Sequence, residues 1–194
     1  MRYGGIGKTL LIGLAVIAAI GVMAFSWYRS GYDKAVRYDE DVNEAWSNVD
    51  TALQRRFDLR PNLVSTVKGY AEHEKGIFES LANARTKYFA NADRGSKIEA
   101  ANEFSGVLSR LLMLQENYPN LKADQSFMAL IDSLEGTENR INVARTRYNE
   151  VSKTLNSFRR SFFGSFFCAR AGVEDAPYFE ASEQAKTEVP QVKF

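Results

Sequence analysis

An uncharged segment near the amino terminus constrains this sequence more than any other feature. No Asp, Glu, Lys or Arg lies between Lys8 and Arg29, which leaves 20 consecutive uncharged residues, 9–28. A helix of about 20 apolar residues crosses the roughly 30 Å hydrocarbon layer of a bilayer. We therefore predict that residues 1–30 form an N-terminal transmembrane anchor. The predicted lipid-facing side chains are Leu10, Leu11, Ile12, Leu14, Val16, Ile17, Ile20, Val22, Phe25 and Trp27.

A cleaved signal peptide is the alternative interpretation of this segment. Small residues two apart, Ala24 and Ser26, resemble a cleavage site. However, the apolar core of a signal peptide usually spans only about 7–15 residues. The length of the segment favours an uncleaved, single-pass anchor in the bacterial cytoplasmic membrane.

The distribution of basic residues does not decide the orientation of this anchor. Arg2 and Lys8 precede the segment, whereas Arg29, Lys34 and Arg37 follow it closely. The excess of Lys and Arg that marks cytoplasmic flanks is therefore absent on either side. An acidic group directly after the segment favours placement of the remaining chain outside the cytoplasm; its members are Asp33, Asp39, Glu40, Asp41 and Glu44.

The residues after the anchor have the periodicity of α-helices. Apolar side chains recur every 3.5 to 3.6 residues, and no alternating strand pattern is present. The pattern predicts helices at about residues 33–59, 61–90, 96–117 and 124–158. Stripes of this kind are buried most simply in an elongated antiparallel bundle of about four long helices. The predicted fold class is all-α, with the bundle in residues 31–180 and a polar tail in residues 181–194.

One carboxylate interrupts the apolar seam predicted for the second helix. Glu74 lies in a heptad-like series that otherwise contains Leu63, Val67, Tyr70, Ile77, Leu81, Ala84 and Tyr88. A carboxylate on a seam needs a partner or access to water. Glu74 therefore either sets the register of the packing or marks the edge of the interface.

The composition argues against several classes of function. A single Cys and a single His exclude an internal disulfide and a zinc-type ligand set. A net charge of +1 argues against a nucleic-acid partner, which a marked basic excess would favour. His73 lies between Glu72 and Glu74, but successive helical residues point in different directions and cannot converge on one metal ion. We expect no cofactor, no metal and no catalysis.

Two blocks of motifs carry a family resemblance. The first comprises residues 44–50 (EAWSNVD), 54–59 (QRRFDL) and 68–74 (KGYAEHE), and the second comprises 116–122 (ENYPNLK), 134–141 (LEGTENRI) and 144–149 (ARTRYN). Together these blocks resemble the LemA family over about residues 29–180. The resemblance implies one N-terminal membrane helix before an α-helical bundle, and it implies no catalytic residues. The family commonly has Phe-Pro where this chain has Phe158 followed by two arginines.

Two groups of residues are candidates for interaction. The corner between the first two helices is rich in polar and aromatic side chains, and its candidate partner or subunit contacts are Trp46, Arg55, Arg56, Asp58 and, further along, Glu74. The alternative is that these residues cap helices and form ion pairs within the bundle. A second group, Phe162, Phe163, Phe166 and Phe167, is expected on one helical face with arginines around it. This face is suited either to a membrane interface or to packing on the bundle or on a neighbouring subunit.

The sequence thus predicts a membrane-anchored helical scaffold that self-assembles or docks partners. Its expected partners are the lipid bilayer, further copies of the chain and other membrane proteins. An adaptor or sensor that regulates an envelope enzyme, such as a membrane protease, is the alternative.

Overall fold

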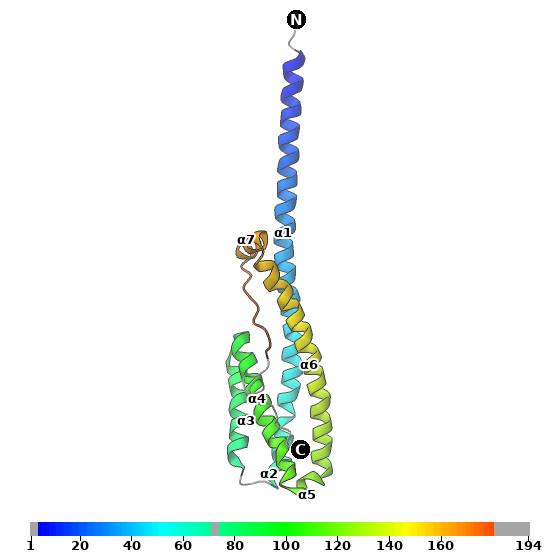
Figure 1. Cartoon of the computed structure of the whole chain (residues 1–194), viewed down its shortest axis with the longest axis vertical. Helices are drawn as coiled ribbons and strands as arrows, with labels where there is room; N and C mark the ends of the chain where they lie inside the picture. The colour runs from blue at the N-terminus through cyan, green and yellow to red at the C-terminus, as the bar shows by residue number, and fades with distance from the viewer. Residues whose placement is uncertain (1–3, 71–73, 181–194) are drawn as a thin grey trace, which may run out of the picture. The chain divides into compact units, whose positions relative to one another are not determined.

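A single long helix begins the chain. The computed structural model describes residues 4–70 and 74–180, and helix α1 runs without interruption over Gly4–Asp58 (Figure 1). The prediction of a separate helix from residue 33 was therefore wrong. Gly31 alone costs a helix only about 1 kcal/mol, and the Arg29–Asp33 ion pair spans the same turn at 3.6 Å. Nothing between residues 28 and 33 is strong enough to break the helix.

The single helix predicted for residues 61–90 was also wrong. Helix α2 covers Arg60–Lys68 and helix α3 covers Lys75–Ala90. The buried part of the seam in α2 ends at Val67, while Gly69 and Tyr70 are exposed and lie in a turn. An exposed glycine contributes no side-chain packing and lowers the stability of a helix. The helix therefore ends before Gly69. Glu74 directly precedes α3 as its N-cap residue and does not lie on a continuous seam.

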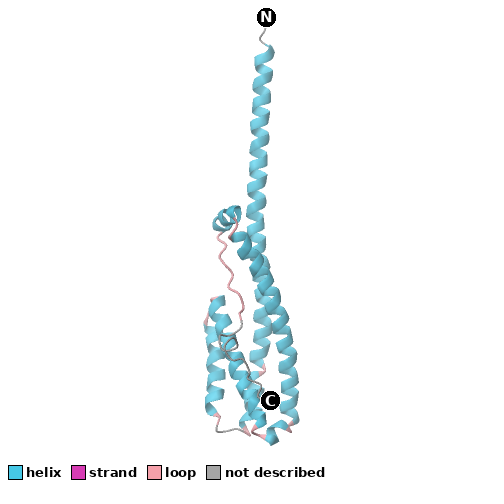
Figure 2. Cartoon of the chain, viewed as in Figure 1, coloured by secondary structure: helices cyan, strands magenta, loops and turns pink. Residues whose placement is uncertain are grey.

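The remaining elements are also helices, and Figure 2 shows only helix and loop in the part of the chain that the structure describes. Helix α4 (Arg94–Met113) starts two residues before the helix predicted from residue 96, because the Asp93 carboxylate caps it by accepting a hydrogen bond from the Ser96 backbone N–H. A 3-10 turn, η1 (Leu114–Glu116), and the short helix α5 (Pro119–Lys122) follow. Helix α6 (Gln125–Arg159) agrees with its prediction to within one residue. Helix α7 (Phe162–Ala171) completes the fold, and the predicted all-α class is confirmed.

The chain divides into two compact units. Unit 1 contains Met1–Val42 and Lys153–Ala176, and unit 2 contains Asn43–Ser152 and Pro177–Phe194. The division predicted from the sequence, at residues 30 and 180, stays a prediction.

Aromatic rings form the centre of unit 2. The Phe57 ring lies 4.7 Å from the ring of Phe104 and 4.8 Å from that of Tyr88, and all three side chains are buried. Helices α3 and α4 pack against each other as a hairpin joined by residues 91–93. Burial of such large rings is a main source of stability in a small bundle.

Two asparagines of α6 hold the backbone of the loop that follows α7. In unit 1, Asn156 donates to the Ala176 carbonyl (2.8 Å) and accepts from its N–H (2.9 Å). In unit 2, Asn149 makes the same two bonds with Phe179, at 3.0 and 2.8 Å. Each side-chain amide thereby satisfies both backbone groups of one residue that has no helical partner.

Candidate interaction surfaces

The N-terminal part of α1 has the length and composition of a membrane span. Among the described residues it is the one helix that is long and apolar enough to cross a bilayer. The ten side chains predicted to face lipid are all exposed, with exposed fractions between 50% and 68%. A helix that is apolar on every side and buried by nothing needs an apolar solvent around it.

Helix α7 lies against α1 immediately after this apolar part. Ser161 caps α7 by accepting a hydrogen bond from the Gly164 N–H. Gly172 closes it with φ of +69°, and the Val173 N–H bonds back to the Cys168 carbonyl. Such a left-handed C-cap is a position that favours glycine. The helix is therefore well defined at both ends.

The four phenylalanines of α7 do not share one environment. Phe167 is buried, and its ring meets those of Trp27 at 5.1 Å and Tyr28 at 6.0 Å. A Cβ atom at Gly31 would overlap the Phe167 ring, so glycine is required for this close approach. Phe162, Phe163 and Phe166 remain exposed, with exposed fractions of 86%, 55% and 53%. Phe167 thus packs on the protein, which is one of the two predicted roles. The rings of Phe162, Phe163 and Phe166 are available for either role.

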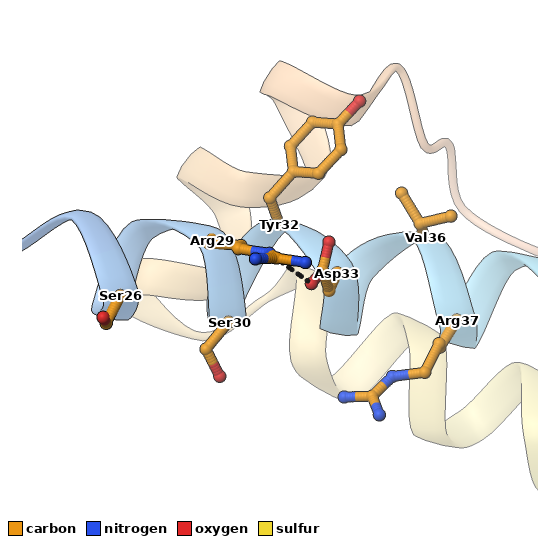
Figure 3. Close-up of a pocket in the computed structure, with 7 residues that line it drawn as sticks. All are labelled: Ser26, Arg29, Ser30, Tyr32, Asp33, Val36 and Arg37. Atoms are coloured by element: carbon orange, nitrogen blue, oxygen red, sulfur yellow. Dashed lines mark ion pairs between the residues drawn. The ribbon is translucent and has the colours of Figure 1, made fainter.

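A shallow polar hollow lies on α1 directly after the apolar segment (Figure 3). Its volume is about 590 Å³, and its lining residues are Ser26, Arg29, Ser30, Tyr32, Asp33, Val36 and Arg37. Arg29 and Asp33 pair across one turn, whereas the Tyr32 ring projects toward α7 in the close-up. The polarity of the α1 surface therefore changes abruptly at this level.

Unit 2 carries a groove between α1 and α6. Its volume is about 520 Å³, and its lining residues are Ala45, Asn48, Thr51, Ala52 and Arg55 from α1 with Asn139, Arg140, Val143, Ala144 and Arg147 from α6. Three of these ten side chains are arginines and none is acidic. Three are alanines, and Val143 is 65% exposed. The groove therefore combines small side chains with an excess of cationic ones.

The predicted partner contacts at the helix corner are divided between surface and interior. Arg55 and Asp58 are exposed, and Arg55 lines the groove. Trp46 is half-buried, with its ring 5.3 Å from that of Tyr148, and Glu74 is half-exposed before α3. Arg56, in contrast, is 4% exposed and points into unit 2. Their role in contacts with a partner stays a prediction.

The Arg56 guanidinium is held by groups of its own unit. It donates to the Ser105 hydroxyl at 2.9 Å, lies 3.4 Å from the Glu138 carboxylate and stacks over the Phe104 ring. Burial lowers the pKa of Arg56 to about 10, although the attraction of Glu138 opposes this shift and Arg145 adds to it. This cation is a structural element of the bundle.

Titratable groups elsewhere also have structural partners. The Tyr88 hydroxyl donates to Asp50 at 2.6 Å, and Lys97 pairs with the same carboxylate at 3.3 Å. The pKa of Tyr88 is raised, mainly by burial and to a lesser extent by this hydrogen bond. The buried Cys168 thiol likewise has a raised pKa, chiefly because of its burial. No cluster of three His, Cys, Asp or Glu side chains suited to a metal ion occurs within residues 4–70 and 74–180, and His73 lies outside the described residues.

Sequence reasoning missed the groove. It also missed the hydrogen bonds by which Asn149 and Asn156 hold the loop after α7, which we call the asparagine clamps. The groove depends on which faces of α1 and α6 meet, and periodicity alone does not give that pairing. The seven-residue separation of Asn149 and Asn156 on one helix was the available signal for the clamps, since residues seven apart share a helical face.

The fold defines a class of protein: an all-α protein with one N-terminal helix, among the described residues, that is long and apolar enough to cross a bilayer. The LemA family profile matches residues 45–194, and the chain belongs to the LemA family.

Similar proteins come from several bacteria. Magnetosome protein MamQ 2 of Paramagnetospirillum magneticum is 25% identical over an alignment that covers 95% of this chain and 78% of that protein. Protein LemA of Metamycoplasma hominis is 23% identical, with 95% and 84% covered. Magnetosome protein MamQ of Magnetospirillum gryphiswaldense is 23% identical, with 98% and 80% covered.

Proposed function

We propose that this chain is a single-pass membrane scaffold that docks partners through unit 2 and catalyses no reaction. The apolar part of α1 anchors it in the bacterial cytoplasmic membrane, with unit 2 outside the cytoplasm. The family assignment and the exposed apolar helix support the anchor.

The groove between α1 and α6 is the observation that carries the docking role. Its alanines admit close approach of a second helix, because small side chains let backbones come near each other. Arg55 and Arg140 make no ion pair with any residue that the structure describes, and Arg147 pairs only with exposed Glu150, at 3.6 Å. A partner helix with a narrow apolar stripe flanked by Asp or Glu would complement both features.

The surroundings of Asp50 and Cys168 favour a scaffold over an enzyme. The Asp50 carboxylate accepts a hydrogen bond from Tyr88 and pairs with Lys97, and the raised pKa of Cys168 keeps its thiol protonated at neutral pH. A protonated, buried thiol is a poor nucleophile. These two groups therefore serve the packing of the fold.

Native mass spectrometry of the full chain, extracted in mild detergent, tests the docking role. We expect a stoichiometric complex, which the double variant Arg140→Glu/Arg147→Glu loses because its groove repels an acidic partner. Arg110→Glu is the matched control, since Arg110 is exposed on α4 outside the groove and its reversal changes charge in the same direction. A complex of identical chains would assign the groove to self-assembly, and a second polypeptide would assign it to an adaptor role.

Two results would contradict the proposal. A strictly monomeric wild-type particle with no stoichiometric companion would remove the scaffold role. A complex that survives the double variant would remove the groove as its docking site.

A further inference from the structure

The position of α7 on α1 coincides with the end of the uncharged segment. Trp27 is the last but one residue of that segment, and its ring meets Phe163 at 5.2 Å and Phe167 at 5.1 Å, both edge to face. Tyr28, the last residue, meets Phe166 at 6.4 Å. Trp and Tyr concentrate at the membrane–water interface. Helix α7 therefore contacts α1 at the level where the uncharged segment ends.

The exposed side of α7 is apolar where a water-facing helix would be polar. Gly164, Phe167 and Cys168 are buried on one side of the helix. The exposed side carries Phe162, Phe163 and Phe166, and the Phe162 and Phe163 rings lie 5.0 Å apart. Figure 1 shows α7 lying across α1 and not along it, so an exposed flank of α7 runs beside the end of the span.

Exposed arginines lie at both ends of α7. Arg160 precedes the helix and Arg170 lies in its last turn; both are exposed, and neither forms an ion pair with a described residue. No Asp or Glu occurs between residues 159 and 173. The hollow at the same level of α1 carries Arg29 and Arg37 with one carboxylate, that of Asp33, which pairs with Arg29 (Figure 3). Cationic side chains beside exposed aromatic rings are the composition of a helix that lies in the lipid interface.

We propose that α7 is a second membrane contact, an in-plane helix whose three exposed phenylalanines enter the boundary between headgroups and acyl chains. Arg160 and Arg170 then pair with lipid phosphates. The inference rests on the proposed role of α1 as a membrane span, because the lipid surface that α7 meets is the one that surrounds α1.

Lipid is a better occupant of this face than a second protein. The exposed face of α7 is continuous with the lipid-facing surface of α1 through Trp27, which is itself 50% exposed. Three rings, two of them partly covered, also fall short of the roughly 800 Å² that each partner buries in a stable protein interface. The excess of arginine matches anionic headgroups.

Site-specific fluorescence of the full chain in nanodiscs tests the inference. In a Cys168→Ala background, single cysteines replace Phe162, Ile17 or Met113 and carry a nitrobenzoxadiazole label. The discs contain phosphatidylcholine and phosphatidylglycerol with one protein copy per disc. Met113 is the matched control, since it is an exposed apolar residue of unit 2 outside the groove.

We expect the labels at positions 162 and 17 to be blue-shifted and quenched by spin-labelled lipid. The label at position 113 should be quenched only by a water-soluble nickel chelate. All three positions are exposed, so the substitutions leave the packing of the fold unchanged.

Each contrary result identifies what has failed. If the label at position 162 is in water while that at position 17 is in lipid, α7 is not a membrane contact but the anchor stands. If the label at position 17 is also in water, the proposed anchor itself is wrong. A label at 162 that is blue-shifted but not quenched by lipid would assign the face to a second copy if the unlabelled Phe162→Cys variant also forms disulfide-linked dimers at higher protein-to-lipid ratios.

Discussion

At the scale of single residues, Arg56 shows how burial creates a dependence on one partner. Its guanidinium is almost wholly removed from water, whereas Glu138, its counter-ion, is 41% exposed. The guanidinium Nε atom forms no hydrogen bond with any described residue. A buried charge that loses its partner retains its desolvation cost, while replacement of the pair by apolar groups can be neutral.

We therefore predict that Glu138→Gln lowers the free energy of unfolding by about 1–2 kcal/mol, a figure reduced for the exposure of Glu138. Thermal unfolding followed by circular dichroism should show this as a lower Tm. Adding Arg56→Met to Glu138→Gln should restore much of the loss. Glu150→Gln removes an exposed ion pair with Arg147 and should change stability by less than about 0.5 kcal/mol. Equal effects of the two glutamate substitutions would contradict the prediction.

The lowered pKa of Arg56 also sets a pH dependence. Between about pH 10 and the ordinary pKa of arginine, the unfolded chain binds this proton more than the folded chain does. The contribution of Arg56 to stability therefore rises with pH through that window. Below about pH 9 the group is charged in both states and contributes no slope.

At the scale of elements, the sequence was most reliable where a long helix has no competing signal. The limits of α6 follow from its unbroken apolar period and from the Asp124 cap, whose carboxylate accepts from the Phe127 N–H at 3.0 Å. The prediction of one continuous helix through Glu74 was wrong, because the spacing of apolar residues does not reveal that the helix is destabilised at Gly69. The four phenylalanines of α7 divide between buried and exposed positions because α7 rests on α1 through Phe167, a contact that the sequence of α7 cannot specify.

The turn from α6 into α7 gives a test at this scale. A Cβ atom at Gly164 would overlap the Phe158 backbone carbonyl, whereas Gly136, exposed within α6, has open space around it. We expect Gly164→Ala to destabilise the chain by about 2 kcal/mol, because a backbone group must shift. Gly136→Ala should stabilise it by about 0.5–1 kcal/mol through helix propensity.

Melting curves of the two glycine variants, measured side by side, check this prediction. A Tm that rises in both would show that the α6–α7 turn relaxes around a methyl group. A fall in both would show that the chain does not tolerate alanine even where space is open.

At the scale of the whole molecule, the side of the membrane that holds unit 2 can be tested directly. In a Cys168→Ala background, we expect Met113→Cys to react with a membrane-impermeable maleimide on intact spheroplasts, because unit 2 is proposed to lie outside the cytoplasm and Met113 is exposed outside the groove. The unaltered chain is the control, since its only thiol is buried. Labelling of position 113 only after lysis would place unit 2 in the cytoplasm.

The sequence alone determined the features that depend on local composition. The uncharged segment, the all-α class, the long α6 and the family resemblance all follow from the spacing of apolar residues and from contiguous motifs. These properties are carried by residues close in the chain, so no knowledge of packing was needed.

Only the tertiary structure decided which side chains remain available at the surface. Phe167 and Phe163 look alike in the sequence, yet one is buried beside Gly31 and the other is half-exposed. Arg55 and Arg56 are neighbours, yet one lines the groove and the other is buried against Glu138. The reason is that burial depends on which helical faces meet, and that pairing is set by contacts between residues far apart in the chain.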